Sequence, residues 1–296
     1  MKRLSILALT VLALVASASA QLTFTPIDFP GGTLTTARGI NNQGDIVGSY
    51  RTVPPRHALL IQGGNFIPLV PTSVLGTNFS EAFKSNDRGD VVGQFTGNDG
   101  FVHGFLLSDG VVTTLDFPGA SDTYAFGINE SGTVVGYWDL LDAGGNVLVY
   151  HGFIFKDGGF AEVNFPGSGD TAALGINARG DIVGLWDSGV TSPTGHGFVC
   201  SQKGECSSFD VPGATITQAD DINAQGQIVG TYIDSGGAQH AFLDAGGNFT
   251  SFDFPGARAT AAWGINSAGQ IVGTYRNAGN VPHGFLAQPD NKAKPE

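Results

Sequence analysis

The sequence predicts an all-β protein: a six-bladed β-propeller of four-stranded antiparallel blades, closed by an N-terminal strand that completes the last blade. Three observations predict this fold. One phrase of about 45 residues occurs six times, each copy divides into four short stretches rich in β-favouring residues, and the two ends of the repeat region hold complementary parts of one copy. No stretch after residue 20 shows a sustained helical period.

Three landmarks recur in the same order along the chain. The first is Asn-x-x-Gly, whose asparagines are 43 to 48 residues apart: Asn41, Asn86, Asn129, Asn177, Asn223 and Asn266. The second is a His-Gly-Phe triplet or a close variant, which begins at His57, His103, His151, His196, His240 and His283. The third is Asp-Phe-Pro-Gly, at 28–31, 116–119 and 253–256, with variants at 164–167 and 210–213. The copies have therefore stayed in phase.

Each copy predicts four strands and their turns. In the last copy, two apolar stretches at 259–265 and 270–275 flank Asn-Ser-Ala-Gly. Asparagine at the first position and glycine at the fourth suit a type I turn that ends in a left-handed residue, which predicts a hairpin. The His-Gly-Phe stretch and a further β-rich stretch supply the third and fourth strands, and Pro-Gly ends the copy.

The ends of the repeat region predict a closed ring. The chain after residue 21 opens with a fourth strand, 22–29, that belongs to no preceding copy, and the last copy stops after its third strand, 283–290. Pairing these two segments would complete a sixth blade and leave no open sheet edge.

The predicted fold has two unlike faces. The Pro-Gly loops and the loops between second and third strands share one face, and the Asn-x-x-Gly and Gly-Gly turns share the other. The first face varies more between copies, as in 137–153, 185–198 and 231–242. We expect function on that variable face, because a rigid scaffold commonly carries its binding residues on loops.

The N-terminus predicts export from the cytoplasm. Residues 1–20 combine a basic start, an apolar run of 12 residues at 4–15 and an Ala-x-Ala match at 18–20, which is typical of a cleaved signal peptide. We therefore expect a propeller domain over 21–290, a polar tail over 291–296, no membrane span after cleavage, and a secreted or periplasmic location. The formal net charge of −12 excludes nucleic acid as a favoured partner.

The two cysteines predict a disulfide. Cys200 and Cys206 flank a turn, and an even pair in an exported protein favours a bond across a hairpin. So short a loop removes little chain entropy, and we expect it to contribute about 2 kcal/mol at most.

With these motifs in hand, the chain resembles the extracellular HAF repeat family. The likeness is carried by His-Gly-Phe, Asp-Phe-Pro-Gly-Ala and Gly-Ile-Asn in fixed order over residues 23–287. The second copy departs from the pattern, with "SEAFKSN" at 80–86 in place of Gly-Ile-Asn. The resemblance implies secretion and a propeller-like repeat fold, and it implies no particular activity.

The repeated histidines and aspartates admit a functional and a structural interpretation. Six histidines at one repeat position could hold metal, since imidazole is a common metal ligand. The structural interpretation is favoured: a half-buried histidine bonded to a carbonyl or carboxylate in each blade. We likewise expect the aspartates of Asp-Phe-Pro-Gly to cap the Pro-Gly turn. We predict no metal site and no cofactor.

One pair of carboxylates stands apart as a candidate site. Asp139 and Asp187 follow Trp138 and Trp186 at equivalent places in neighbouring copies. An aromatic beside an acid suits sugar binding, and two carboxylates about 5–10 Å apart could cleave a glycosidic bond. The competing interpretation makes both tryptophans packing residues, because other copies have Tyr or Phe there.

The favoured function is a binding or scaffold module, monomeric, with an extracellular polysaccharide, another surface polymer or a protein as its partner. No catalytic residue is assigned. One alternative is an extracellular hydrolase or lyase that acts on a polymer through carboxylates on the variable face. Another is a structural envelope protein, which would self-associate.

Overall fold

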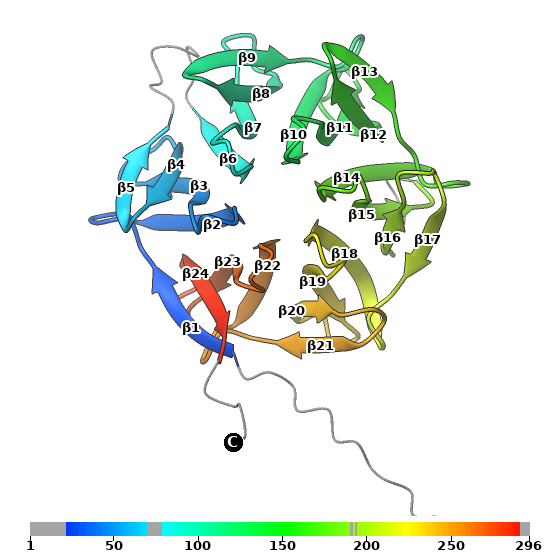
Figure 1. Ribbon diagram of the computed structural model, residues 1–296. Helices are drawn as coiled ribbons and strands as arrows, with labels where there is room; N and C mark the ends of the chain where they lie inside the picture. The colour runs from blue at the N-terminus through cyan, green and yellow to red at the C-terminus, as the bar shows by residue number, and fades with distance from the viewer. Residues whose placement is uncertain (1–21, 70–78, 190–191, 193, 291–296) are drawn as a thin grey trace, which may run out of the picture.

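The computed structural model describes residues 22–69, 79–189, 192 and 194–290, which form six four-stranded antiparallel sheets arranged around a central axis (Figure 1). The predicted six-bladed propeller is confirmed. The predicted signal peptide and polar tail lie outside the described residues. In the described part of the chain, no helix is long and apolar enough to cross a membrane.

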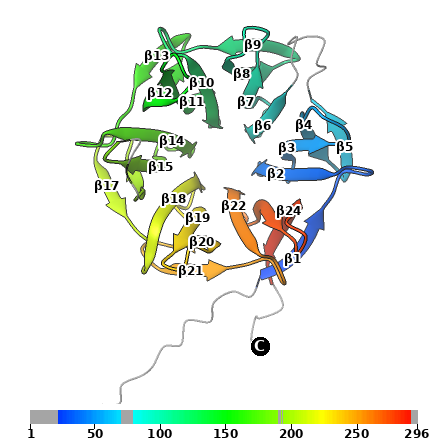
Figure 2. The same cartoon turned by 180° about the vertical axis from the view of Figure 1, so that it is seen from behind.

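Five blades consist of strands that follow one another along the chain, with the first strand of each nearest the axis (Figures 1 and 2). Blade 1 is β2 (Leu34–Ile40), β3 (Ile46–Arg51), β4 (His57–Gln62) and β5 (Asn65–Pro68). Blade 2 is β6 (Ser80–Ser85), β7 (Val91–Thr96), β8 (Val102–Ser108) and β9 (Val111–Leu115). Blade 3 is β10 (Asp122–Ile128), β11 (Val134–Leu141), β12 (Val147–Lys156) and β13 (Gly159–Glu162). Blade 4 is β14 (Asp170–Ile176), β15 (Ile182–Asp187), β16 (His196–Cys200) and β17 (Cys206–Phe209). Blade 5 is β18 (Ala214–Ile222), β19 (Ile228–Asp234), β20 (Gln239–Asp244) and β21 (Phe249–Phe252).

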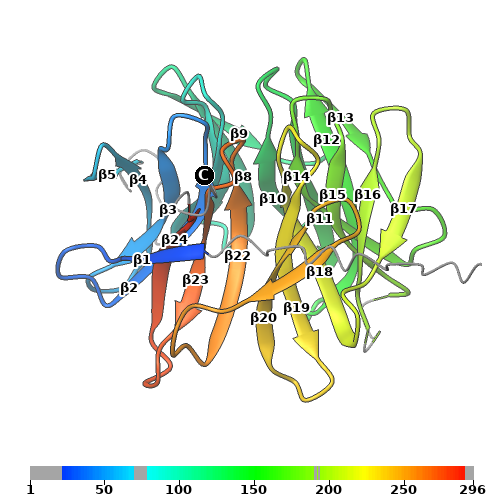
Figure 3. The same ribbon diagram turned by 60° about the horizontal axis from the view of Figure 1, so that its bottom comes forward.

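Blade 6 joins the two ends of the described chain. It is β22 (Ala259–Ile265), β23 (Ile271–Arg276), β24 (Pro282–Pro289) and β1 (Leu22–Ile27). β1 pairs antiparallel with β24 along its whole length, and the two lie side by side in Figures 1 and 3. Phe24 of β1 adds an aromatic contact with Phe285, at 5.8 Å between ring centroids. The predicted closure is confirmed.

The hydrophobic core lies between blades and repeats with them. The Phe of each His-Gly-Phe triplet is almost fully buried: Phe105, Phe153, Phe198, Phe242 and Phe285. These rings require a glycine on the second strand beside them. A Cβ added to Gly136, for example, would lie 2.8 Å from the ring of Phe153 and 1.9 Å from the carbonyl oxygen of Tyr124.

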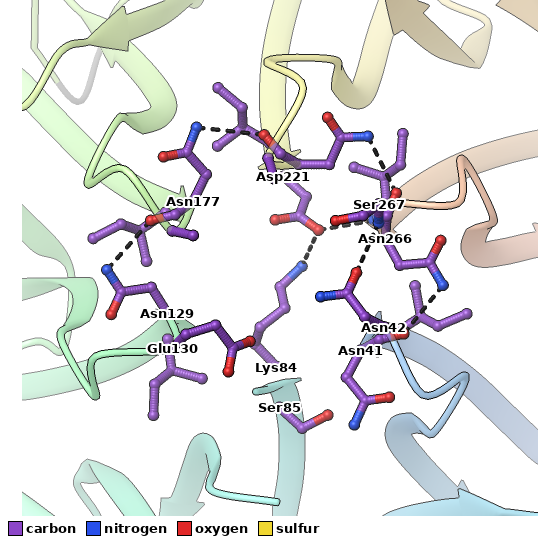
Figure 4. A pocket seen from close by; sticks show the side chains of 18 residues that line it. Asn41, Asn42, Lys84, Ser85, Asn129, Glu130, Asn177, Asp221, Asn266 and Ser267 are labelled. Atoms are coloured by element: carbon purple, nitrogen blue, oxygen red, sulfur yellow. Dashed lines mark hydrogen bonds and ion pairs between the residues drawn. The ribbon is translucent and has the colours of Figure 1, made fainter. Parts of the chain in front are cut away.

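The Asn-x-x-Gly turns form a hydrogen-bonded ring around the axis. In each turn the asparagine Oδ1 accepts the backbone N–H groups two and four residues later, as Asn266 does from Ala268 and Gln270. Its Nδ2 donates to the backbone carbonyl of the asparagine in the next blade, at 3.1–3.4 Å. The sixth bond runs from Asn266 to Asn41 and closes the circle (Figure 4). The six asparagines are therefore structural.

The predicted disulfide is confirmed. Cys200 and Cys206 are bonded across the hairpin of β16 and β17, in register with one another.

Replacing Asn266 with aspartate tests the ring. Asn266→Asp keeps the oxygen that accepts from its own turn and removes the N–H that donates to Asn41. We expect a loss of about 1–3 kcal/mol, because a buried carbonyl loses its donor and a carboxylate approaches it. Urea unfolding measures the change, with Asn65→Asp, on the exposed β4–β5 turn, as the matched control. Equal stability of the two variants would contradict the structural role.

Candidate functional site

The variable face carries a pocket of about 450 Å³ between blades 3 and 4. We call it the tyrosine pocket. Its polar lining consists of Tyr124, Tyr137, Asp139, Tyr150, Asp187 and Gln218. The structure thus brings together the two carboxylates singled out in the sequence, one from β11 and one from β15.

Four aromatic contacts connect the rings that line this pocket, the longest of them between Tyr124 and Phe126 at 6.5 Å. Tyr137 stacks on Tyr124 at 4.5 Å between centroids, and it also stacks on Phe126 at 5.5 Å. Tyr150 meets Tyr137 edge-on at 5.9 Å. The four rings form a continuous aromatic wall. All of them except Phe126 carry a hydroxyl group. Such a wall can contact the apolar face of a ring-shaped ligand while the hydroxyls form hydrogen bonds.

Asp139 is a buried carboxylate with one oxygen that lacks a hydrogen-bond partner among the described residues. The residue is 3% exposed, and the oxygen in question is Oδ1. Burial, followed by repulsion from Asp122 on the neighbouring strand, raises the pKa of Asp139 to about 6. A buried polar atom of this kind is costly to fold and is available to a ligand hydroxyl.

Asp187 is held in place by blade 3. Its Oδ2 accepts a hydrogen bond from the Tyr150 hydroxyl at 2.5 Å, and its Oδ1 accepts the Gly189 N–H at 2.7 Å. Burial, with Asp187 next to the hydroxyl, raises the pKa of Tyr150, so this hydroxyl stays a donor. The Tyr150 backbone N–H also donates to Asp170 of blade 4 at 2.9 Å. The pocket walls are therefore tied to each other.

The tryptophans lie elsewhere. Each occupies the opposite side of its strand from the aspartate that follows it, because side chains alternate along a strand. Trp138 stacks on Phe117 at 4.8 Å, and Trp186 stacks on Phe165 at 4.6 Å. Neither lines the tyrosine pocket. Both pack in the layer between blades, which matches the structural interpretation of these residues.

Histidine and aspartate of the repeat contact each other within a blade. Four histidine Nδ1 atoms lie 2.7–3.0 Å from the aspartate that directly follows the same blade's fourth strand. The pairs are His103–Asp116, His196–Asp210, His240–Asp253 and His283–Asp28. The predicted turn cap is therefore replaced by a histidine contact. Thr35 accepts the turn N–H of Phe29 instead, and threonines do the same in four other blades.

Four of the six histidines thus contact a carboxylate of their own blade. The two copies without the aspartate, those of His57 and His151, have no such ion pair. Burial opposes the charged form of His103, but Asp116 and Asp99 outweigh it and raise its pKa. No group of three or more His, Cys, Asp or Glu side chains that could hold a metal ion occurs within the described residues.

An ion pair spans the central axis. Lys84 and Asp221 stand where the other four copies have glycine on the innermost strand. They come from blades 2 and 5 and meet across the axis at 2.6 Å, with both side chains buried (Figure 4). A small cavity of about 70 Å³ lies on the turn side of this pair.

The tyrosines are the site residues that sequence reasoning missed. Tyr124 and Tyr137 occupy positions filled in other copies by Thr, Ser, Ala, Gln, Glu or Leu. Each is thus a departure from the repeat, Tyr124 on the first strand of blade 3 and Tyr137 on the second. The presence of tyrosine at these positions could have identified them as site residues in the sequence. That inference also requires knowing which side of each strand faces a pocket.

Known structures support the fold and no more. The chain is similar to a protein of unknown function from Dyadobacter fermentans (TM-score 0.56, 9% identity, covering 90% of this chain and 99% of that chain). It is also similar to the Aleuria aurantia lectin (0.52, 12%, 88% and 93%) and to a gluconolactonase from Xanthomonas campestris (0.51, 12%, 86% and 86%). No family profile and no curated protein sequence matches the chain.

Asp139→Asn tests whether the pocket carboxylate costs stability. The pKa of Asp139 in the folded protein, about 6, lies above the pKa of an aspartate in the unfolded chain. The stability associated with the protonated carboxyl group is therefore fully present below pH 4 and is lost as the pH rises to 6 and beyond. Asparagine does not titrate. We expect the free energy of unfolding of the variant to exceed that of the wild type by about 1–3 kcal/mol at pH 7.5, and we expect this difference to disappear at pH 4. Urea unfolding at both pH values measures this, and a pH-independent difference would contradict it.

Proposed function

We propose that this protein is an exported propeller that binds carbohydrate in the tyrosine pocket. The observation that carries the proposal is the combination of an aromatic wall with two carboxylates in one cavity between blades 3 and 4. Aromatic faces contact the C–H faces of sugar rings, and carboxylates accept hydrogen bonds from sugar hydroxyls. A volume of about 450 Å³ has room for one or two sugar rings.

Exposed apolar residues elsewhere on the variable face favour a ligand that extends beyond the tyrosine pocket. Of the seven large hydrophobic residues exposed in the described chain, five lie in or beside loops between second and third strands. They are Val53, Phe101, Val147, Leu148 and Val281. Val147 also lines the tyrosine pocket. Exposed apolar residues gathered on one face favour contact with an extended partner there, such as a surface polysaccharide.

Export and the HAF repeat resemblance belong to the same proposal. Both rest on the sequence: the leader-like residues 1–20 and the repeated motifs. The disulfide Cys200–Cys206 supports an oxidising location, because such bonds persist mainly outside the cytoplasm.

A second candidate function is hydrolysis or elimination at a glycosidic bond. The observation that favours it is Asp139, whose pKa of about 6 suits a general acid, in the same pocket as Asp187. The test is reducing-end release from a polysaccharide panel by the wild type and by Asp139→Asn with Asp187→Asn. Activity that survives the double change would dismiss this candidate.

Binding is tested with an array of neutral oligosaccharides followed by calorimetry. We expect Tyr137→Ala to weaken binding about fivefold or more, because stacking on an aromatic ring contributes about 1 kcal/mol or more. Tyr150→Phe, which removes only the hydroxyl on Asp187, should weaken it less. Tyr232→Phe, which removes a hydroxyl bonded to Ser251 outside the pocket, is the matched control.

Two results would count against the proposal. One is the absence of any neutral glycan ligand for the wild type. The other is equal affinity in Tyr137→Ala and the control. Light scattering in the same samples distinguishes the structural-envelope alternative, which requires concentration-dependent self-association.

A further inference from the structure

Asp139 and Asp187 occupy the same position of the repeat in neighbouring blades. On the opposite side of the ring, that position is occupied by arginine instead of aspartate. Both aspartates occupy the sixth residue of their second strands, counted from the Ile/Val-Val-Gly start. In blades 1 and 6 the same position is Arg51 and Arg276, and in blades 2 and 5 it is uncharged. Blades 3 and 4 adjoin one another, as do blades 6 and 1, so each like-charged pair faces one gap between blades (Figure 1).

The gap between blades 6 and 1 is itself a pocket, of about 350 Å³. We call it the arginine pocket. Four arginines line it, Arg38, Arg51, Arg56 and Arg276, and no acidic residue does. The chain has eight arginines and a net charge of −12, so this concentration of positive charge is local.

One buried carboxylate compensates only part of that charge. Glu81 accepts from Arg38 at 2.9 Å and lies 3.2 Å from Arg56, and no described salt bridge includes Arg51 or Arg276. Four positive charges against one negative charge leave a formal charge of +3 around the pocket.

The two unpaired arginines are nevertheless positioned. Arg276 donates to the Asn280 carbonyl at 3.1 Å, and Arg51 donates to the Thr33 hydroxyl at 3.4 Å. Each of these bonds uses one N–H, which leaves most of the five donors of each guanidinium available. Two guanidinium groups on either side of a gap suit an oxyanion that accepts hydrogen bonds from both.

The rest of the pocket lining is partly aromatic and apolar. Trp263 lines the pocket, with the Arg38 guanidinium 4.2 Å from the centre of its ring, and Leu34, Ala261 and Pro282 add apolar surface. An inorganic anion would use none of this surface. A sugar ring that bears an acidic group would use both the apolar lining and the arginines.

We propose that the arginine pocket binds an anionic sugar residue, with its carboxylate or sulfate held by Arg51 and Arg276 and its ring against the apolar lining that includes Trp263. This site is separate from the tyrosine pocket and lies on the same face. It does not depend on the tyrosine pocket being a site. If both are occupied, the propeller holds an acidic polysaccharide at two places across its axis.

Calorimetry with three oligosaccharides of equal length tests the proposal: oligogalacturonate, a sulfated dextran fragment and neutral dextran. We expect an anionic one to bind and the neutral one not to bind in this pocket. Arg51→Gln and Arg276→Gln should each weaken binding about tenfold or more, since charge-assisted bidentate bonds are among the strongest in proteins. Arg179→Gln, an equal charge change at an exposed arginine on the opposite face, should leave affinity within about twofold.

The arms of the test separate the sources and the two sites. Uronate binding identifies a carboxylate ligand, and sulfated dextran binding alone identifies a sulfate ligand. Tyr137→Ala should remove only binding at the tyrosine pocket, so the binding that Arg51→Gln and Arg276→Gln weaken persists in it, and failure of the tyrosine pocket leaves this result intact. The proposal is overturned if neither anion binds, or if both arginine variants, folded by thermal melting, bind as tightly as Arg179→Gln.

Discussion

Closure between the last blade and the first is the constraint on which the rest of this structure depends. It is made at two places: along the edge where β1 pairs with β24, and at the axis where Asn266 donates to the Asn41 carbonyl. The first removes an exposed sheet edge and the second completes a circle of bonds between turns. Blades 6 and 1 are therefore neighbours only because the ring is closed, and the arginine pocket exists only between them.

A repeated scaffold makes departures from the repeat informative. The same asparagine, histidine and glycine positions recur because each performs one packing or hydrogen-bonding task per blade. Charged residues that replace the common residue do something different. Lys84 and Asp221 replace glycine near the axis and form an ion pair with each other across it. Asp139, Asp187, Arg51 and Arg276 share one strand position and form two pockets of opposite charge on one face.

Most of the fold was predictable because its determinants are local or periodic. The turn signal of Asn-x-x-Gly, the spacing of its copies and the incomplete ends specified six blades, the closing strand and the two faces. The disulfide followed from two cysteines that flank one turn. The aspartates of Asp-Phe-Pro-Gly were misjudged, because their partner histidine is on the neighbouring third strand rather than in the turn, 13 or 14 residues away in three of the four pairs.

The site was predictable only in part. Asp139 and Asp187 were found because equivalent positions in neighbouring copies draw attention. Tyr124, Tyr137 and the arginine pocket were missed, because each pocket combines residues from different blades and one of them spans the chain ends. Whether a strand residue faces a pocket or a neighbouring blade depends on the alternation of side chains, which also separates Trp138 from Asp139.

Residue-level amide hydrogen exchange by NMR tests ring closure most directly. If β1 is an integral strand of blade 6, its amides and those of the Asn266 turn exchange as slowly as the amides of β2 and β3, by global unfolding. Rapid exchange in β1 while the other five blades stay protected would show that the ring is open at this edge, and it would contradict the account.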